Sequence, residues 1–399
     1  MKILLITEEY EKLTVGMFNV WSTFCKNLHP SDEVTILLNK EHWFASLKHN
    51  ADCKEKGSKK LQDVVSCPFL VPLHQVEEMF QGIGNKNLQW FLRLLCLLVN
   101  EIVFLPKIAI WFLYILRSKD FDVIVFHHGG WPAGAFVRHL LLLGWIFGAK
   151  NRCLVLHSFP SPYSKRLKFL ELIQERLIGR AASKILTVSK AASAALSKRN
   201  FMRPIYVVYN GIQTIEKPVK KINKGSALPL VGFLGAFVPT KGAHVLIEAG
   251  QYISSNCKLE LLGKGDPSYL RRLEGLAGLQ PYHCKFSINE EDIEAFLKNI
   301  DILVVPSIDY EAFGMVILEA MVHKKPVICS DFGGMKEIVL DGVTGRVVRA
   351  NDPVVLGRAI NDLLTSPTVR KKMGQEGYKR VKTLFTVDKM MDSYYHHFR

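Results

Sequence analysis

The sequence lacks several features that would assign it to a specialised class of protein. Its eight cysteines are scattered, and no two of them form a C-x-x-C pair, which argues against a zinc site and against a disulfide framework. No low-complexity tract interrupts a composition that is 48% hydrophobic and 22% charged. We therefore expect an ordinary globular protein whose thiols are reduced, as in the cytosol.

Long uncharged hydrophobic runs are lacking as well. The most apolar region, residues 88–118, is interrupted by Arg93, Glu101 and Lys107, so no stretch reaches the roughly 18 uncharged residues that a spanning helix needs. The opening MKILLITEEY meets acidic residues early and is predicted to be a first strand rather than a signal peptide. Together with residues 139–150, the apolar region is expected to form either buried core helices or a surface that dips into a bilayer.

Acidic residues are scarce relative to basic ones. The net charge is +15, and within residues 1–215 Lys and Arg exceed Asp and Glu by 11. A basic half of this kind could meet an anionic membrane, a nucleic acid or a phosphorylated substrate, or could simply reflect a lysine-rich proteome. No recognisable nucleic-acid-binding module is present, so nucleic acid is not expected as a partner.

What the chain does contain is a regular alternation of short apolar runs and helical patterns. At 399 residues, two domains are the default expectation. Near-continuous apolar strands between helices are typical of parallel sheets that are covered on both faces. The predicted strands are 2–7, 33–38, 123–127, 152–157, 184–188 and 205–209 in the first half, and 229–234, 258–262, 284–286, 302–306 and 326–329 in the second.

The polar stretch QTIEKPVKKINKGSA has no hydrophobic periodicity and is predicted to contain a linker. The predicted organisation is a first domain over 1–215, a linker over 216–227 and a second domain over 228–385. The fold class is therefore predicted to be α/β, with two doubly wound Rossmann-like domains facing a cleft. Ligands of such domains bind at the carboxyl ends of the strands.

One segment of the second half, DYEAFGMVILEAM, places Glu311 and Glu319 eight positions apart. Eight residues of helix span about 12 Å, which is too far for a shared proton or metal but suits gripping two ends of a hydroxyl-rich ligand. If the helix begins near Phe313 and Gly314, its free amides form an anion site between the two acids. The spacing alone also fits an ordinary helix with acids at its start and on its exposed face.

Three glycine-containing turns follow predicted strands of the same half. They hold Gly235, Lys241 and Gly242 in the first turn, Gly263, Lys264 and Gly265 in the second, and Gly333 and Gly334 in the third, with Glu337 in the helical turn that follows. A lysine where a strand meets a helix suits a phosphate. This arrangement is typical of a nucleotide cleft. Neither a dinucleotide-binding fingerprint nor a P-loop is present, which disfavours hydride-transfer enzymes and NTPases.

Taken together, these segments resemble glycosyltransferase family four, the retaining, nucleotide-sugar-dependent group 1 glycosyltransferases of the GT-B fold. The resemblance is carried, in order along the chain, by GAFVPTKG, LLGKGD, DILVVPSIDYEAFGMVILEAM, KKPVICSDFGGMKEIV and DGVTGRVV. Weaker matches in the first half are LVLHS, ILTVSKAA and VVYNGI. The last residues, 386–399, resemble the family's final helix, which packs back on the first domain.

The resemblance implies a role for each matching residue. Glu311 would contact hydroxyls of the donor sugar, and Glu319 would accept hydrogen bonds from the ribose. Lys241 would balance the charge on the departing nucleoside diphosphate, and His157 would lie across the cleft near the sugar. The catalytic residues implied are His157, Glu311 and Lys241. The donor-binding residues implied are Gly16, Gly235, Lys241, Gly263, Lys264, Glu311, Phe313, Gly314, Met315 and Glu319.

The sequence departs from the family pattern at some positions. Ala236 stands where family members usually have an arginine that adds a second cation at the diphosphate, and Lys264 is a candidate substitute. In the region after the first strand, where the family often has adjacent glycines, only Gly16 is available. For His127 and His128, a structural role and a functional role both stay open.

The resemblance implies a retaining transferase that moves a hexose-type unit from a nucleotide diphosphate sugar to a hydroxyl of a glycan or lipid-linked acceptor, in surface polysaccharide biosynthesis. No acidic metal site is evident in the sequence, so neither a metal nor another cofactor is expected. The expected location is cytoplasmic, peripheral on the inner face of the cell membrane. A GT-B-fold epimerase or phosphorylase, and a degenerate relative that binds nucleotide sugar without transferring it, are the alternatives.

Overall fold

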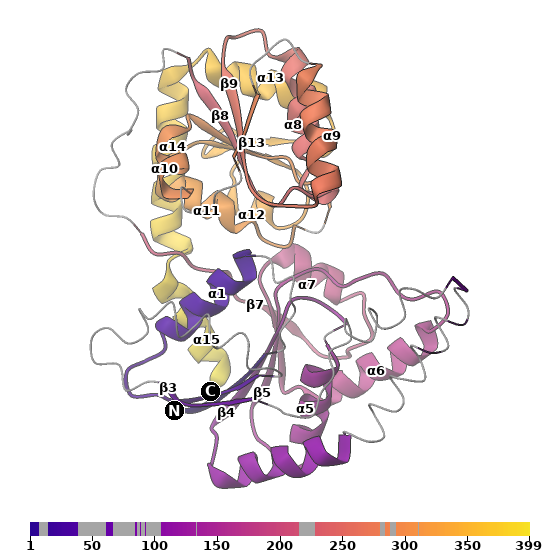
Figure 1. Ribbon diagram of the computed structural model, residues 1–399. Helices are drawn as coiled ribbons and strands as arrows, with labels where there is room; N and C mark the ends of the chain where they lie inside the picture. Colours follow the sequence, from indigo (N-terminus) through magenta and orange to yellow (C-terminus); the bar gives the residue numbers. More distant parts are fainter. Residues whose placement is uncertain are drawn as a thin grey trace.

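The computed structural model describes residues 1–7, 15–38, 61–66, 84–85, 88, 92, 105–132, 134–214, 228–279, 284–287, 293–309 and 311–399. These residues form two α/β domains, one above the other in Figure 1, each built around a parallel sheet. The predicted fold class is confirmed. The predicted linker, 216–227, lies outside the described residues.

The first domain is built on seven parallel strands in the order β3-β2-β1-β4-β5-β6-β7. They are β1 (Lys2–Thr7), β2 (Glu33–Leu38), β3 (Leu61–Ser66), β4 (Val123–His128), β5 (Arg152–Leu156), β6 (Lys184–Thr187) and β7 (Ile205–Val207). The strand order reverses between β1 and β4, and such a switch point is where open α/β sheets bind ligands. Along β1, Leu4 and Ile6 pack in the core on one face of the sheet, while Ile3 and Leu5 pack on the other.

The second domain repeats this plan with six parallel strands in the order β10-β9-β8-β11-β12-β13. They are β8 (Leu230–Leu234), β9 (Lys258–Leu262), β10 (Cys284–Ser287), β11 (Ile302–Val305), β12 (Val327–Ser330) and β13 (Gly345–Val348). Here the strand order reverses between β8 and β11. Every predicted strand is present, with ends that differ by at most two residues. Two of the four edge strands of these described sheets, β3 and β13, were not predicted.

Helices cover both faces of each sheet (Figure 1). The first domain has α1 (Val15–Lys26), a helix over 105–118, α5 (Ala135–Ile146), α6 (Lys168–Ala181) and α7 (Lys190–Leu196). The second has the 3-10 turn η2 (Pro239–Lys241), α8 (Ala243–Ala249), η3 (Gly250–Tyr252), α9 (Pro267–Gly278), α10 (Ile293–Asn299), α11 (Met315–Val322), α12 (Met335–Ile338), α13 (Pro353–Leu364) and α14 (Pro367–Leu384). The chain ends in α15 (Val387–Phe398).

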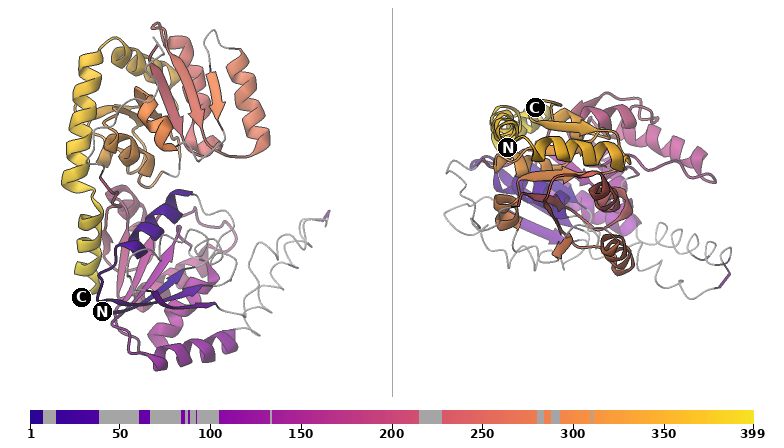
Figure 2. Two further views of the ribbon diagram at one scale, coloured as in Figure 1. Left: turned by 60° about the vertical axis from the view of Figure 1, so that its left-hand side comes forward. Right: turned by 90° about the horizontal axis from the view of Figure 1, so that it is seen from above.

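The last helix leaves the second domain and packs against the first (Figure 2). The buried rings of Tyr394 and Phe398 meet Phe24 of α1, with centroids 4.9 and 6.2 Å from it. The Tyr395 hydroxyl donates to the Asp32 carboxylate of the first domain. These contacts join α15 to the core of the first domain.

The apolar region is described only in part, since residues 89–91 and 93–104 lie outside the described ranges. In the helix over 105–118, Ile108, Phe112 and Ile115 are buried in the first domain's core. One face of this helix therefore packs in the core, while Ile110 and Tyr114 on another face are exposed, and the bilayer alternative stays a prediction. No helix in the described ranges combines the length and the hydropathy needed to cross a bilayer.

Candidate donor-binding cleft

The predicted donor-binding residues of the second half gather at one edge of its sheet. Gly235 directly follows β8, Gly263 follows β9, and Glu311 comes six residues after β11. Because the strands are parallel, their carboxyl ends meet at this edge. The edge faces the first domain (Figure 1), so these residues line the side of the second domain turned toward the partner domain.

Lys241 and Glu311, 70 positions apart in the sequence, are in direct contact. Lys241 ends η2, and its Nζ lies 2.6 Å from Oε2 of Glu311. The Ser307 hydroxyl donates to the same carboxylate oxygen over 3.3 Å. The Lys241 side chain is 28% exposed and that of Glu311 is 12% exposed. The pair is therefore held in place yet open to a ligand.

The turn that carries Lys241 is fixed against the end of β11. The backbone amide of Ile308 donates to the carbonyl of Thr240 over 2.8 Å. A Cβ added at Gly242 would lie 2.0 Å from the carbonyl oxygen of Pro306, a distance that no side chain could occupy. This close backbone approach requires glycine and brings the lysine beside the acid.

Helix α11 begins at Met315, as the sequence predicts. Its N-cap is Gly314, whose φ of 100° is a left-handed conformation that favours glycine. Among the described residues no side chain caps this end, so none of them uses the amides of the first turn as a capping group. The side chain of Phe313 is buried in the core. The start of α11 is thus a candidate anion site next to Glu311.

Glu319 lies on the second turn of α11. Burial raises the pKa of its carboxyl group. Among the described residues, none forms a hydrogen bond or ion pair with this carboxylate. A half-buried acid with no partner among the described residues suits a ligand-binding position.

The turn after β9 lies beside the position of the replaced arginine. The amide of Phe237 donates to the carbonyl of Lys264 over 2.8 Å, so the backbone of Lys264 runs next to Ala236. The Lys264 side chain is exposed. This placement fits Lys264 as the substitute cation, a role that stays a prediction.

Across the cleft, His157 follows β5 and pairs with His127 of β4. Nε2 of His157 lies 3.1 Å from Nδ1 of His127, and the two rings are stacked with centroids 5.4 Å apart. Burial lowers the pKa of His157 to about 4 and that of His127 well below its ordinary value. The outer nitrogens, Nδ1 of His157 and Nε2 of His127, are buried and have no hydrogen-bond partner in the described ranges. Both nitrogens are therefore available for a hydrogen bond with a polar group of a ligand.

His128 has a different role. Its Nδ1 donates to the carbonyl of Gly130 over 2.7 Å, and its Nε2 accepts the amide of Gly134 over 2.8 Å. Both ring nitrogens thus hold the loop after β4. For His128 the structure favours the structural alternative.

These buried histidines predict acid sensitivity. Their folded pKa values lie well below the ordinary 6.5 because of burial, so below pH 6.5 the unfolded chain binds more protons than the folded chain. The free energy of unfolding should then fall as the pH drops from 6.5 towards 4, by up to about 1.4 kcal/mol per pH unit for each histidine. Urea unfolding between pH 7 and 4.5 measures this slope.

A substitution among the buried histidines tests whether they cause this pH dependence. In His127→Leu, the slope below pH 6.5 should be shallower than in the wild type, because one titrating group is gone. Tyr394→Phe, which changes a neighbouring ring without removing a histidine, should keep the wild-type slope. Equal slopes in wild type and His127→Leu would contradict the assignment.

Glu337, which the sequence placed only in a helical turn, connects the two domains. Its carboxylate accepts the backbone amides of Lys190 and Ala191, at 2.9 and 2.8 Å, at the start of α7 in the first domain. The hydroxyl of Tyr209 donates to it over 3.0 Å. Nearby, the rings of Phe159 and Phe332 meet across the same interface with centroids 5.9 Å apart. The third glycine turn is thus an interdomain contact.

Gly16 is the second residue of α1, at the helix end that faces the second domain (Figure 1). Residues 8–14 before it lie outside the described ranges.

In the described ranges no three His, Cys, Asp or Glu side chains are grouped to hold a metal ion. Independence from metal stays a prediction.

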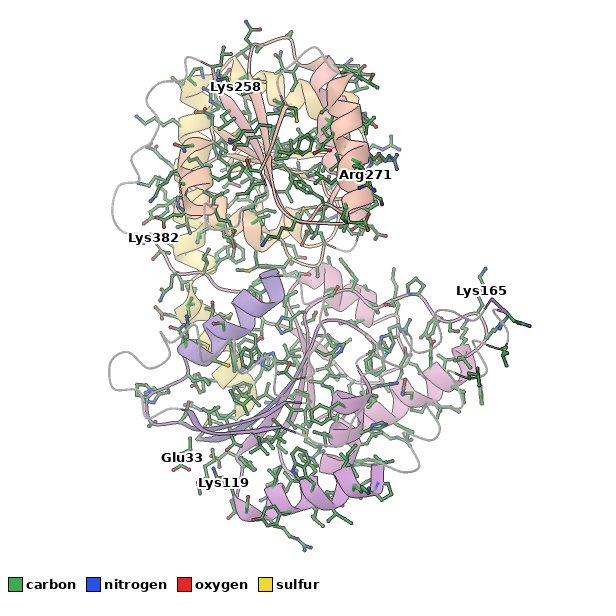
Figure 3. All side chains as sticks on the ribbon, viewed as in Figure 1. Glu33, Lys119, Lys165, Lys258, Arg271 and Lys382 are labelled. Carbon is green, nitrogen blue, oxygen red and sulfur yellow. The ribbon has the colours of Figure 1, made fainter. Side chains whose placement is uncertain are left out.

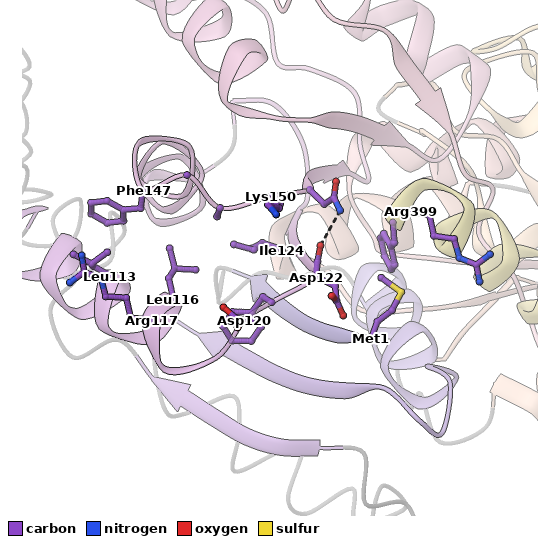
Figure 4. Close-up of a pocket in the computed structure, with 15 residues that line it drawn as sticks. Met1, Leu113, Leu116, Arg117, Asp120, Asp122, Ile124, Phe147, Lys150 and Arg399 are labelled. Carbon is purple, nitrogen blue, oxygen red and sulfur yellow. Dashed lines mark hydrogen bonds between the residues drawn. The ribbon is translucent and has the colours of Figure 1, made fainter.

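A cavity of about 980 Å³ lies elsewhere in the first domain (Figure 4). It is lined by Met1, Asp122 and Asn151, which precede β1, β4 and β5. It therefore opens at the amino ends of the strands, opposite the edge where α/β sheets bind ligands. This cavity is not part of the donor-binding cleft.

Comparisons with known structures support the fold. A glycosyltransferase from Rickettsia africae covers 100% of this chain and 97% of its own, with a TM-score of 0.73 and 18% identity. The Anabaena protein HepE, solved in complex with UDP-glucose, covers 99% of this chain and 98% of its own, with a TM-score of 0.69 and 20% identity. At these identities the likeness establishes the architecture alone, and it is that of the GT-B glycosyltransferases.

Sequence comparisons identify the family in addition to the fold. The family model described as "Glycosyl transferases group 1" matches residues 214–380, and "Glycosyltransferase Family 4" matches residues 68–216. An uncharacterized glycosyltransferase of Methanocaldococcus jannaschii is 31% identical over 271 residues, 66% of this chain and 71% of the relative. O-antigen chain mannosyltransferase C of Escherichia coli is 31% identical over 165 residues, 41% of this chain and 44% of the relative. The chain therefore belongs to the group 1 glycosyltransferases, as its motifs indicated.

Proposed function

We propose that this protein is a retaining hexosyltransferase that moves a sugar from a nucleotide diphosphate sugar to a hydroxyl of a glycan or lipid-linked acceptor. The observation that carries the proposal is the 2.6 Å ion pair of Lys241 and Glu311, open to the cleft beside the uncapped start of α11. A cation and free amides flanked by two carboxylates complement a ligand that is a sugar, a diphosphate and a ribose in sequence. In support, structures of HepE contain UDP and UDP-glucose.

In this proposal the diphosphate lies over the first turn of α11. As the bond between the anomeric carbon and the diphosphate oxygen breaks, negative charge grows on the leaving group. Lys241 and the first-turn amides stabilise that charge more in the transition state than in the ground state. Glu311 accepts hydrogen bonds from sugar hydroxyls, and Glu319 gains from the ribose hydroxyls the partners that it lacks among the described residues.

Retention follows from attack on the face that the diphosphate leaves. The acceptor oxygen bonds to the anomeric carbon while the departing phosphate oxygen takes the acceptor's proton. Because His157 is neutral at pH 7, it can serve as a hydrogen-bond partner for a sugar hydroxyl through Nδ1 but not as an acid. No metal or other cofactor takes part in this proposal.

The acceptor is proposed to bind the first domain, which carries most of the positive charge. A lipid-linked glycan at the cytoplasmic face of the membrane, in surface polysaccharide assembly, suits that charge. The names of relatives support this choice, among them the O-antigen chain mannosyltransferase and a phosphatidyl-myo-inositol mannosyltransferase of Mycobacterium leprae.

A screen of nucleotide sugars by thermal stabilisation tests the proposal. A donor at a hundredfold excess over its Kd stabilises the folded chain by about 2.7 kcal/mol, which is readily measured as a rise in Tm. One nucleotide sugar should raise the Tm and release nucleoside diphosphate when acceptor is added. Stabilisation without release would favour the second candidate, an inert binder, which Ala236 makes conceivable. No stabilisation by any nucleotide sugar would contradict both.

A further inference from the structure

The exposed surface of α6 and of the residues before it has an unusual composition. Between positions 165 and 180, every exposed residue is either Lys or Arg or a large apolar residue. The basic residues are Lys165, Arg166, Lys168, Arg176 and Arg180, and the apolar residues are Leu167, Phe169, Leu170, Ile173 and Leu177. Phe169 is 74% exposed and Leu170 is 59% exposed, so this surface is apolar and basic at once.

Helical geometry gathers these side chains on one face. At about 100° per residue, Phe169, Leu170, Ile173 and Leu177 fall within about 100° around the axis. We call these four residues the α6 stripe. By the same geometry Arg176 lies at one border of it and Arg180 falls within it, next to that border.

The acidic residues of the helix are turned to the opposite side. Glu175 is fully buried and accepts hydrogen bonds from the indole of Trp131 at 3.0 Å and the hydroxyl of Tyr163 at 2.8 Å. It also pairs with Arg199 at 2.5 Å, and the same guanidinium lies 3.7 Å from Glu171. These contacts fix the rotation of α6, so its outward face contains cations and apolar groups but neither of the helix's carboxylates.

We propose that this face of α6 docks on an anionic phospholipid bilayer. An amphipathic helix with an apolar stripe bordered by Lys and Arg binds the interface of such a membrane, through apolar burial and attraction to acidic headgroups. The charge of the face favours this partner over a neutral protein surface, and the positive excess of residues 1–215 has the same sign. The inference deepens the proposed function. Only the reason for docking, access to a lipid-linked acceptor, rests on that function.

The position of α6 suits a lipid-linked acceptor. The segment between His157 and α6 contacts the second domain, where Phe159 meets Phe332. The chain then runs outward to Lys165, at the outer edge of the first domain in Figure 3. A bilayer at α6 would therefore contact the chain a few residues after the interdomain contact of Phe159, which suits an acceptor carried by the membrane.

Vesicle flotation of the full chain tests the proposal, with phosphatidylcholine vesicles that contain or lack phosphatidylglycerol. The wild type should float only with the anionic vesicles at low salt. Phe169→Ser combined with Ile173→Ser should lower vesicle binding at least about tenfold, because two exposed apolar side chains are removed. Arg176→Glu combined with Arg180→Glu should lower it as well. The matched control is Ile110→Ser with Tyr114→Ser, an exposed apolar pair on the helix over 105–118, which should bind like the wild type.

Several outcomes would overturn the proposal. They are no flotation of the wild type with anionic vesicles at low salt, unchanged flotation of the Phe169/Ile173 variant, or loss of flotation in the control pair alone. A wild-type dimer on gel filtration that the Phe169/Ile173 variant abolishes would assign the face to a second copy of the chain instead. Stabilisation by nucleotide sugar, measured in the same samples, keeps the two proposals apart. A chain that floats but is not stabilised by any donor supports docking and contradicts the proposed function. A chain that a donor stabilises but that does not float supports the proposed function and contradicts docking.

Discussion

Replacing Lys241 by alanine is expected to lower the rate of sugar transfer at saturating donor by about two to three orders of magnitude. The substitution removes the cation placed to stabilise the charge on the departing diphosphate. It also leaves the Glu311 carboxylate, 12% exposed, with the Ser307 hydroxyl as its remaining described partner. Initial rates of nucleoside diphosphate release, measured against donor concentration, separate the effect on kcat from the effect on KM.

A second ion pair in the same domain provides the control. Lys285 lies 2.7 Å from Glu260 on neighbouring strands, and its side chain is 60% exposed. Lys285→Ala removes an ion pair of the same chemistry away from the start of α11, so the rate should stay within about twofold of the wild type. Wild-type turnover in Lys241→Ala would show that this lysine does not act on the leaving group.

Replacing Glu337 by alanine is expected to lower kcat/KM for the donor at least about tenfold. The two backbone amides of α7 and the Tyr209 hydroxyl lose their shared acceptor. The substitution therefore removes a contact that fixes the position of one domain relative to the other. Hydrogen bonds to a charged group are each worth about 1.5–3 kcal/mol, so the contact between the domains should weaken measurably. The residue is a positioning residue, since it touches neither the ion pair nor the start of α11 in the described contacts.

Two measurements separate this role from a general loss of stability. Small-angle scattering should show a larger radius of gyration for Glu337→Ala, because the domains separate more readily. Lys336→Ala, at the exposed neighbouring position of α12, should match the wild type in both scattering and kinetics. Unchanged kcat/KM and an unchanged radius of gyration in Glu337→Ala would refute the positioning role.

The sequence predicted the elements whose signals are local. Buried strands such as β1 and β11 are continuous apolar runs, and the start of α11 is marked by Gly314 between a loop and an apolar stretch. Two of the edge strands, β3 and β13, have no such signal. β3, LQDVVS, contains Gln62 and Asp63, and β13, GRVV, begins with glycine and arginine. Short strands with polar positions are hard to tell from loops by pattern alone.

The contacts that make the cleft could not be predicted from local pattern. Lys241 and Glu311 meet because the turn after β8 packs on the end of β11, which depends on strand order. The pairing of His127 with His157, and the reach of Glu337 to α7, depend on it too. The α6 stripe could not be recognised for a related reason. Apolar residues at this helical spacing usually form the buried face of a helix. Only the burial of Glu175 shows that the apolar residues of α6 face outward instead.

The anomeric configuration of the product tests the central claim most directly. With the donor found by the screen and a suitable acceptor, proton NMR should show release of nucleoside diphosphate and a new glycosidic bond with the anomeric configuration of the donor. In Glu311→Gln, which keeps the size of the side chain but removes its charge, the signal of that bond should be greatly reduced. An inverted product, or a bond formed as fast by Glu311→Gln as by the wild type, would contradict the account.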